Sequence, residues 1–124
     1  MHKILLVDDD PDIRKIAVIS LQHVGGFEVR TAVSGEDGLS VAGPWQPDLV
    51  LLDVMMPGLD GPSTFARLRE DPATRDIPVV FMTAKVQQRE VQRYLALGAC
   101  GVIAKPFDPM TLSQQIRDIA SGRA

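Results

Sequence analysis

Four short apolar runs along the chain each end in a polar residue. Runs of this kind are typical of parallel strands that are buried on both faces of a sheet. Alternation of apolar and polar positions over residues 27–32 predicts one more strand. The five predicted strands cover residues 4–7, 27–32, 49–53 and 77–83, and a last segment that ends at Lys105.

The segments between these strands carry apolar residues three and four positions apart, a spacing that predicts helices. Asp10 followed by Pro11 is typical of a helix start, because the carboxylate caps the helix and the proline fits its first turn. Gly98 is typical of a helix end. The predicted helices cover residues 11–24, 34–43 and 86–97, and two segments that begin at residues 62 and 108.

Strands and helices therefore alternate five times. This order predicts right-handed crossovers and helices on both faces of the sheet. The expected fold class is α/β, a doubly wound five-stranded parallel sheet. A chain of 124 residues with 45% hydrophobic content is expected to form one domain over residues 1–124 with an ordinary buried core.

Composition narrows the expected partners and location. The net charge is -3, and no segment gathers Lys and Arg with aromatic residues, so we expect no direct nucleic acid binding. The first apolar run is too short for a signal peptide or a membrane span, which predicts a cytoplasmic protein without membrane contact. The apolar neighbours of Cys100, the one cysteine, predict a thiol packed in the core.

Three carboxylates are expected at one edge of the sheet, because parallel strands place their carboxyl ends on the same side. Asp8 and Asp9 follow the first strand, and Asp53 ends the third. Carboxylates crowded in this way repel each other unless a cation lies among them, and Mg²⁺ is the ion that pairs with carboxylates and phosphate. Thr83 and Lys105 end two further strands at the same edge. The sequence therefore predicts a Mg²⁺-dependent phosphoryl site at this edge. Two other acids, Asp10 and Asp60, are predicted helix caps.

These residues, in this order, resemble the receiver domain of two-component response regulators over the whole chain. The elements that carry the resemblance are Asp8-Asp9, Asp53, the Met56-Pro57-Gly58 turn, Gly61, Thr83 and Lys105-Pro106. The resemblance implies a flavodoxin-like sheet with strand order 2-1-3-4-5. It also implies a phosphorylation-switched signalling domain that accepts a phosphoryl group on Asp53 from a sensor histidine kinase or a phosphotransfer protein and then changes its partner binding.

The resemblance also assigns a role to each site residue. Asp8, Asp9, Asp53 and the main-chain carbonyl of Met55 would bind Mg²⁺. Thr83 and Lys105 would contact the phosphoryl group, and the bond between Lys105 and Pro106 would be cis. The protein would catalyse only its own phosphorylation and dephosphorylation, and its downstream protein target is not named by the sequence. The fourth helix, last strand and fifth helix would form the surface for partners or for dimerisation.

Two other functions fit part of the pattern. A phosphatase of the haloacid dehalogenase type would use Asp8 as its nucleophile, with Thr83 and Lys105 in supporting roles, but this reading leaves Asp53 without a function. A receiver-like adaptor would bind its partner without phosphorylation.

One departure from the receiver pattern is Val102, which stands where an aromatic residue is usual. The usual coupling between the Thr and that aromatic residue is therefore not expected here.

Overall fold

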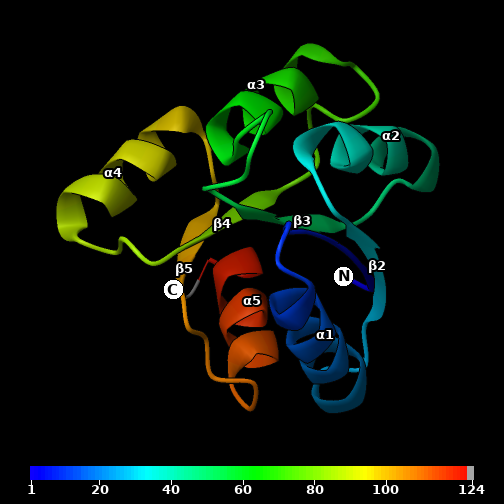
Figure 1. Cartoon of the computed structure of the whole chain (residues 1–124), viewed down its shortest axis with the longest axis vertical. Helices are drawn as coiled ribbons and strands as arrows, with labels where there is room; N and C mark the ends of the chain where they lie inside the picture. Colours follow the sequence, from blue (N-terminus) through cyan, green and yellow to red (C-terminus); the bar gives the residue numbers. More distant parts are fainter. Residues whose placement is uncertain (123–124) are drawn as a thin grey trace.

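A central parallel sheet of five strands forms the middle layer of the protein (Figure 1). The computed structural model describes residues 1–122. The strands lie in the order β2-β1-β3-β4-β5, which confirms the doubly wound, flavodoxin-like fold predicted from the sequence. Their bounds are β1 (Lys3–Val7), β2 (Glu28–Ala32), β3 (Leu49–Asp53), β4 (Val79–Thr83) and β5 (Gly101–Ala104).

Helices cover both faces of the sheet. The helices are α1 (Pro11–Ile19), α2 (Gly35–Trp45), α3 (Gly61–Glu70), α4 (Gln88–Leu97) and α5 (Leu112–Ala120). Figure 1 shows α1 and α5 on one side of the sheet and α2, α3 and α4 on the other. No helix within residues 1–122 has both the length and the apolar character needed to cross a membrane.

The alternation of side chains along β3 divides the interior into two cores. Leu49 and Leu51 pack with Leu21 and with Leu112 of α5. Leu52 faces the other way and packs with residues of α2, α3 and α4. Every residue of β3 and β4 is buried, so the centre of the sheet is anchored on both faces. The polar residues at the ends of these strands are therefore held by rigid elements.

Helix ends differ from the sequence prediction in three places. After α1 the chain continues as a π-helical turn (Ser20–Val24) before the glycine pair. Helix α2 runs through Pro44 and ends where Gln46 takes a left-handed backbone with φ 53°. Asp108 does not cap α5; its carboxylate accepts the Met110 N–H at 2.9 Å in a turn, and the helix begins later.

The prediction that Cys100 is buried is wrong. Its side chain is exposed, although the flanking Ala99 and Gly101 are buried. The Cys100 N–H donates to the carbonyl of Val79 at 2.9 Å, which fixes the backbone beside β4. Successive side chains of an extended segment point to opposite sides, so burial of both neighbours turns the thiol outward.

Gly61 sits against the backbone that carries Asp53. A Cβ atom at this position would lie 2.5 Å from the Asp53 carbonyl oxygen and 2.7 Å from the Val54 Cα. We expect Gly61→Ala to lower the free energy of unfolding by about 1–3 kcal/mol, because backbone must move to make room. Ser63→Ala, two residues further along α3, is the control and should change it by less than about 0.5 kcal/mol. Urea unfolding measures both, and equal stability of the two variants would contradict this packing.

Candidate functional site

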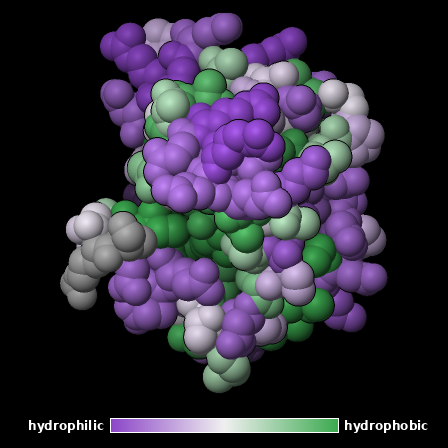
Figure 2. Space-filling model, turned by 90° about the vertical axis from the view of Figure 1, so that its left-hand side faces the viewer, coloured by the Kyte–Doolittle hydropathy of each residue, from purple (hydrophilic) through white to green (hydrophobic). Residues whose placement is uncertain are grey.

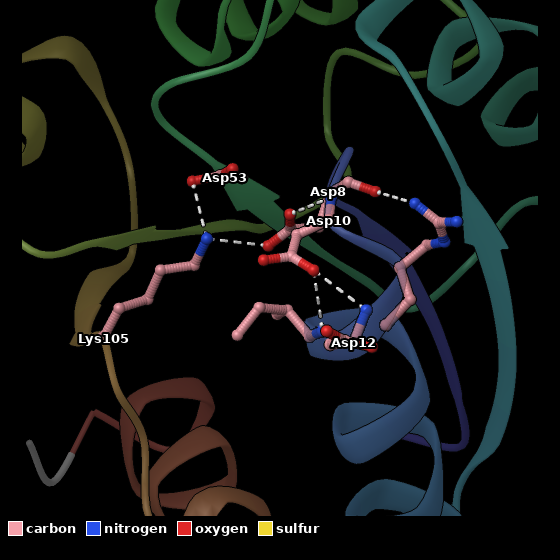
Figure 3. A network of polar contacts seen from close by, with 7 residues as sticks. Asp8, Asp10, Asp12, Asp53 and Lys105 are labelled. Atoms are coloured by element: carbon pink, nitrogen blue, oxygen red, sulfur yellow. Dashed lines mark hydrogen bonds and ion pairs between the residues drawn. The ribbon is translucent and has the colours of Figure 1, made fainter.

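Three charged residues from three strand ends meet at one edge of the sheet (Figure 3). Asp53 ends β3, Asp8 follows β1, and Lys105 follows β5. The Lys105 Nζ lies 2.8 Å from Asp8 Oδ2 and 3.2 Å from Asp53 Oδ1. Asp8 is fully buried and Asp53 is 4% exposed. The structure thus brings together the two carboxylates and the ammonium that the sequence placed at this edge.

The backbone around Asp8 fixes its carboxylate in place. Its Oδ1 accepts the Asp10 N–H at 2.9 Å, and its main-chain carbonyl accepts Arg14 Nη1 at 2.8 Å. The Asp8 N–H in turn donates to the Ala32 carbonyl at 3.1 Å, which ties this end of β1 to β2. Arg14 was missed by the sequence analysis because its partner is a main-chain oxygen, for which a sequence carries no signal.

Burial, and after it the negative charge of Asp8, raises the pKa of Asp53 to about 6. The charge and hydrogen bond of Lys105 and the Met55 N–H act in the opposite direction without cancelling this rise. For Lys105, burial would lower the pKa, but contact with the two carboxylates outweighs it and raises the pKa above its usual value of 10.5. Lys105 is therefore a cation at neutral pH, and Asp53 is an unusually basic carboxylate.

The donor set suits a small hard cation. Carboxylate oxygens of Asp8, Asp9 and Asp53 all lie within 4.8 Å of one another. Asp9 is exposed, so the cluster opens to solvent on that side. Asp8 Oδ2 is buried and accepts no hydrogen bond within the described residues. It forms an ion pair with the Lys105 ammonium at 2.8 Å. Oxygen ligands of this kind fit Mg²⁺ better than a soft metal.

Thr83 ends β4 at the same edge. Asp53 is paired in register with Met82, the residue before Thr83, and Thr83 is itself paired with Ala104, the residue before Lys105. The Thr83 side chain is buried, and its Oγ1 accepts the Lys85 N–H at 3.0 Å. Among residues 1–122 no acceptor takes its own hydroxyl proton, so this proton can be donated to a further oxygen.

The remaining sequence predictions for this edge concern caps and loop residues. Asp10 accepts the N–H groups of Asp12 and Ile13 at the start of α1, and Asp60 accepts the Ser63 N–H at the start of α3, so both are helix caps. The bond between Lys105 and Pro106 is cis. The Met55 side chain is 69% exposed and points away from the core.

Comparison with known proteins decides the family. Residues 4–117 match the family model of the response regulator receiver domain. The chain belongs to this family. Receiver domains are the signalling domains of two-component systems, so the resemblance drawn from the sequence is confirmed.

Solved receiver structures share this architecture. The chemotaxis response regulator CheY4 of Vibrio cholerae superposes with a TM-score of 0.88 and 32% identity, over 96% of this chain and 98% of that one. The N-terminal domain of a response regulator receiver protein from Methanoculleus marisnigri gives a TM-score of 0.76 and 38% identity, over 98% of this chain and 95% of that one.

Similar sequences belong to longer proteins. The chain is 39% identical over 117 residues to the DNA-binding dual master transcriptional regulator RpaA of Synechocystis, covering 94% of this chain and 48% of that protein. It is 38% identical over 119 residues to the response regulator PleD of Caulobacter vibrioides, covering 26% of that protein. The receiver thus spans about half or less of these relatives.

The expectation of no direct nucleic acid binding needs correction. It rested on a net charge of -3 and on the lack of a basic, aromatic segment. RpaA, to which the receiver is similar, is a DNA-binding regulator. The error has a physical cause: the charge pattern of 124 residues says nothing about the half of such a relative that these residues do not match.

The raised pKa of Asp53 predicts how stability varies with pH in the presence of a metal chelator. Between about pH 4 and 6 the folded receiver holds a proton on Asp53 more tightly than the unfolded chain does. The free energy of unfolding should therefore fall as the pH rises through this window and stay lower above it. Asp53→Asn removes this titration, so we expect it to be more stable than the wild type at pH 8 and to show a flatter pH profile. Urea unfolding at pH 4.5, 6 and 8 measures this, and lower stability of Asp53→Asn at pH 8 would contradict it.

Proposed function

We propose that Asp53 accepts a phosphoryl group from a histidine kinase or a phosphotransfer protein, and that this event switches the receiver between partner-binding states. The observation that carries the proposal is the position of Asp53: a nearly buried carboxylate at a strand end, beside a second carboxylate and in contact with one ammonium. Burial and the neighbouring charge make its oxygen more basic, which favours attack on phosphorus.

The transfer itself needs few protein groups. One Asp53 oxygen attacks the phosphorus, the bond from phosphorus to the donor histidine nitrogen breaks, and that nitrogen keeps the electron pair. Lys105 is placed to neutralise one phosphoryl oxygen, and the free hydroxyl proton of Thr83 can be donated to another. A magnesium ion held by Asp8, Asp9, Asp53 and the Met55 main-chain carbonyl would supply further positive charge to the phosphoryl oxygens.

Asp53 suits the nucleophile role better than Asp8. Asp8 is fully buried, one of its oxygens accepts the Asp10 N–H, and the other contacts Lys105. Attack by Asp8, as the phosphatase alternative requires, would break one of these contacts inside the protein. Asp53 pairs with Lys105 through Oδ1 at 3.2 Å, a longer contact than the 2.8 Å contact of Asp8 Oδ2. We therefore propose that the receiver transfers the phosphoryl group to its own Asp53 rather than to or from a separate substrate.

The proposed output surface consists of α4, β5 and α5. Val102 of β5 pairs in register with Phe81 of β4, two residues before Thr83. A valine has no large ring to rotate, so we propose that the signal leaves through the backbone of the loop after Thr83 and through α4. A preference of a few kcal/mol for one arrangement is enough to invert a two-state population.

Phosphorylation by a small acyl phosphate tests the acceptor. The wild type, incubated with acetyl phosphate and Mg²⁺, should gain one phosphoryl group on Asp53, and Asp53→Asn should gain none. Asp60→Asn is the matched control, because asparagine also caps a helix and should leave labelling unchanged. Intact-protein mass spectrometry followed by peptide mapping measures the outcome.

The position of the label distinguishes the receiver from the phosphatase and the adaptor. Label on Asp8 would support the phosphatase, and a wild type that takes no label would support the adaptor. Full labelling of Asp53→Asn would also overturn the proposal. Omission of Mg²⁺, with a chelator present, should slow labelling of the wild type at least tenfold if the acidic cluster binds the ion.

A further inference from the structure

A cavity of about 580 Å³ lies between the loop that follows β3, the end of β4 and helix α4. In Figure 1 these elements lie at the upper left of the sheet. Thr83 and Met55 line the cavity on the side of the acidic cluster, and Arg93 and Tyr94 line it on the side of α4. The cavity therefore connects the proposed phosphoryl site to a helix of the proposed output surface.

Two cations face this cavity without a carboxylate partner. Lys85 and Arg93 both line it, and neither forms an ion pair within residues 1–122. The one acid in the wall, Asp60, already accepts the Ser63 N–H at 2.8 Å as the cap of α3. The cavity consequently carries an excess of positive charge, and an anion is the ligand chemistry that would complement it.

Helix α4 makes few buried contacts with the rest of the protein. Tyr94 is its single buried residue, and its ring packs on Phe81 of β4 with the centroids 5.1 Å apart. The residue before the helix, Gln87, makes no side-chain capping hydrogen bond. Arg93 is the neighbour of Tyr94, and its guanidinium lies 6.0 Å from the Tyr94 ring centroid. A ligand bound by Arg93 would therefore act on α4 next to Tyr94, the residue that anchors the helix.

We propose that Arg93 is a positioning residue for the phosphorylated state: it binds an oxygen of the phosphoryl group on Asp53 across the cavity and holds α4 toward the site. This inference rests on the proposed function. A phosphoryl group carries close to two negative charges at neutral pH. The planar guanidinium binds phosphate oxygens in a bidentate way, which the point charge of Lys85 cannot do.

A movement of α4 toward the phosphoryl site would also affect the opposite side of this helix. Val91 and Leu95 line a second cavity, of about 310 Å³, together with Val102 of β5 and Ile119 of α5. Figure 2 shows this side of the molecule, where a green hydrophobic band lies below the purple residues of α4. A shift of α4 toward the phosphoryl site would change the shape of this second cavity without any rotation of an aromatic ring at Val102.

Beryllofluoride, a stable mimic of the phosphoryl group, tests the role of Arg93. With Mg²⁺ present, Arg93→Met should bind it roughly three- to tenfold more weakly than the wild type, because one charge-assisted contact is lost. Arg93→Lys should fall between the two. Arg89→Met is the matched control on the same helix, because Arg89 does not line the cavity and its side chain is 88% exposed.

Amide hydrogen exchange gives a second readout that a general change in stability would not mimic. Beryllofluoride should increase the protection of α4 amides in the wild type and in Arg89→Met, but not in Arg93→Met, while amides near Thr83 and Lys105 gain protection in all three. Equal affinity and equal α4 protection in Arg93→Met and the wild type would overturn the inference and leave the proposed function intact. A wild type that binds no beryllofluoride and takes no phosphoryl group would overturn both.

Discussion

One ammonium group lies between two buried carboxylates, and the chemistry proposed for this receiver depends on that contact. The sheet order places β4 between β3 and β5, so Lys105 must reach past β4 to touch both Asp53 and Asp8. Without this cation, two negative charges would face each other at a nearly dry strand end. With it, Asp53 stays in the site as a carboxylate whose pKa is about 6. The same crowding that makes Asp53 a proposed nucleophile also makes the cluster a candidate Mg²⁺ site.

The strand positions could be predicted from the sequence because buried parallel strands leave little ambiguity. β3 and β4 are buried along their whole length, and they appear in the sequence as unbroken apolar runs that stop at Asp53 and Thr83. Elements of this kind necessarily bring their last residues to one edge of the sheet. The strand order could not be obtained in this way. It came from the resemblance to receivers, as did the cis bond before Pro106.

Features set by tertiary contacts were not predictable from the sequence. The exposure of Cys100 depends on which side of a short extended segment faces the core, and its apolar neighbours suggested the wrong side. The contact of Arg14 with the Asp8 carbonyl involves a main-chain atom. The cavity beside Thr83 brings together Met55, Lys85 and Arg93, which are separated in sequence and belong to two loops and a helix. Only the folded chain shows that Lys85 and Arg93 form no ion pair among the described residues.

The stability of Lys105→Met with and without Mg²⁺ tests the central contact most directly. In a chelator at pH 8 the variant should lose more than about 1 kcal/mol of unfolding free energy, because Asp8 and Asp53 then repel each other without a cation between them. Mg²⁺ should raise the unfolding free energy of Lys105→Met by more than it raises that of the wild type, because the ion no longer competes with the ammonium for the carboxylates. If the variant is as stable as the wild type in the chelator, or if Mg²⁺ stabilises both proteins equally, the contact does not have the role assigned to it.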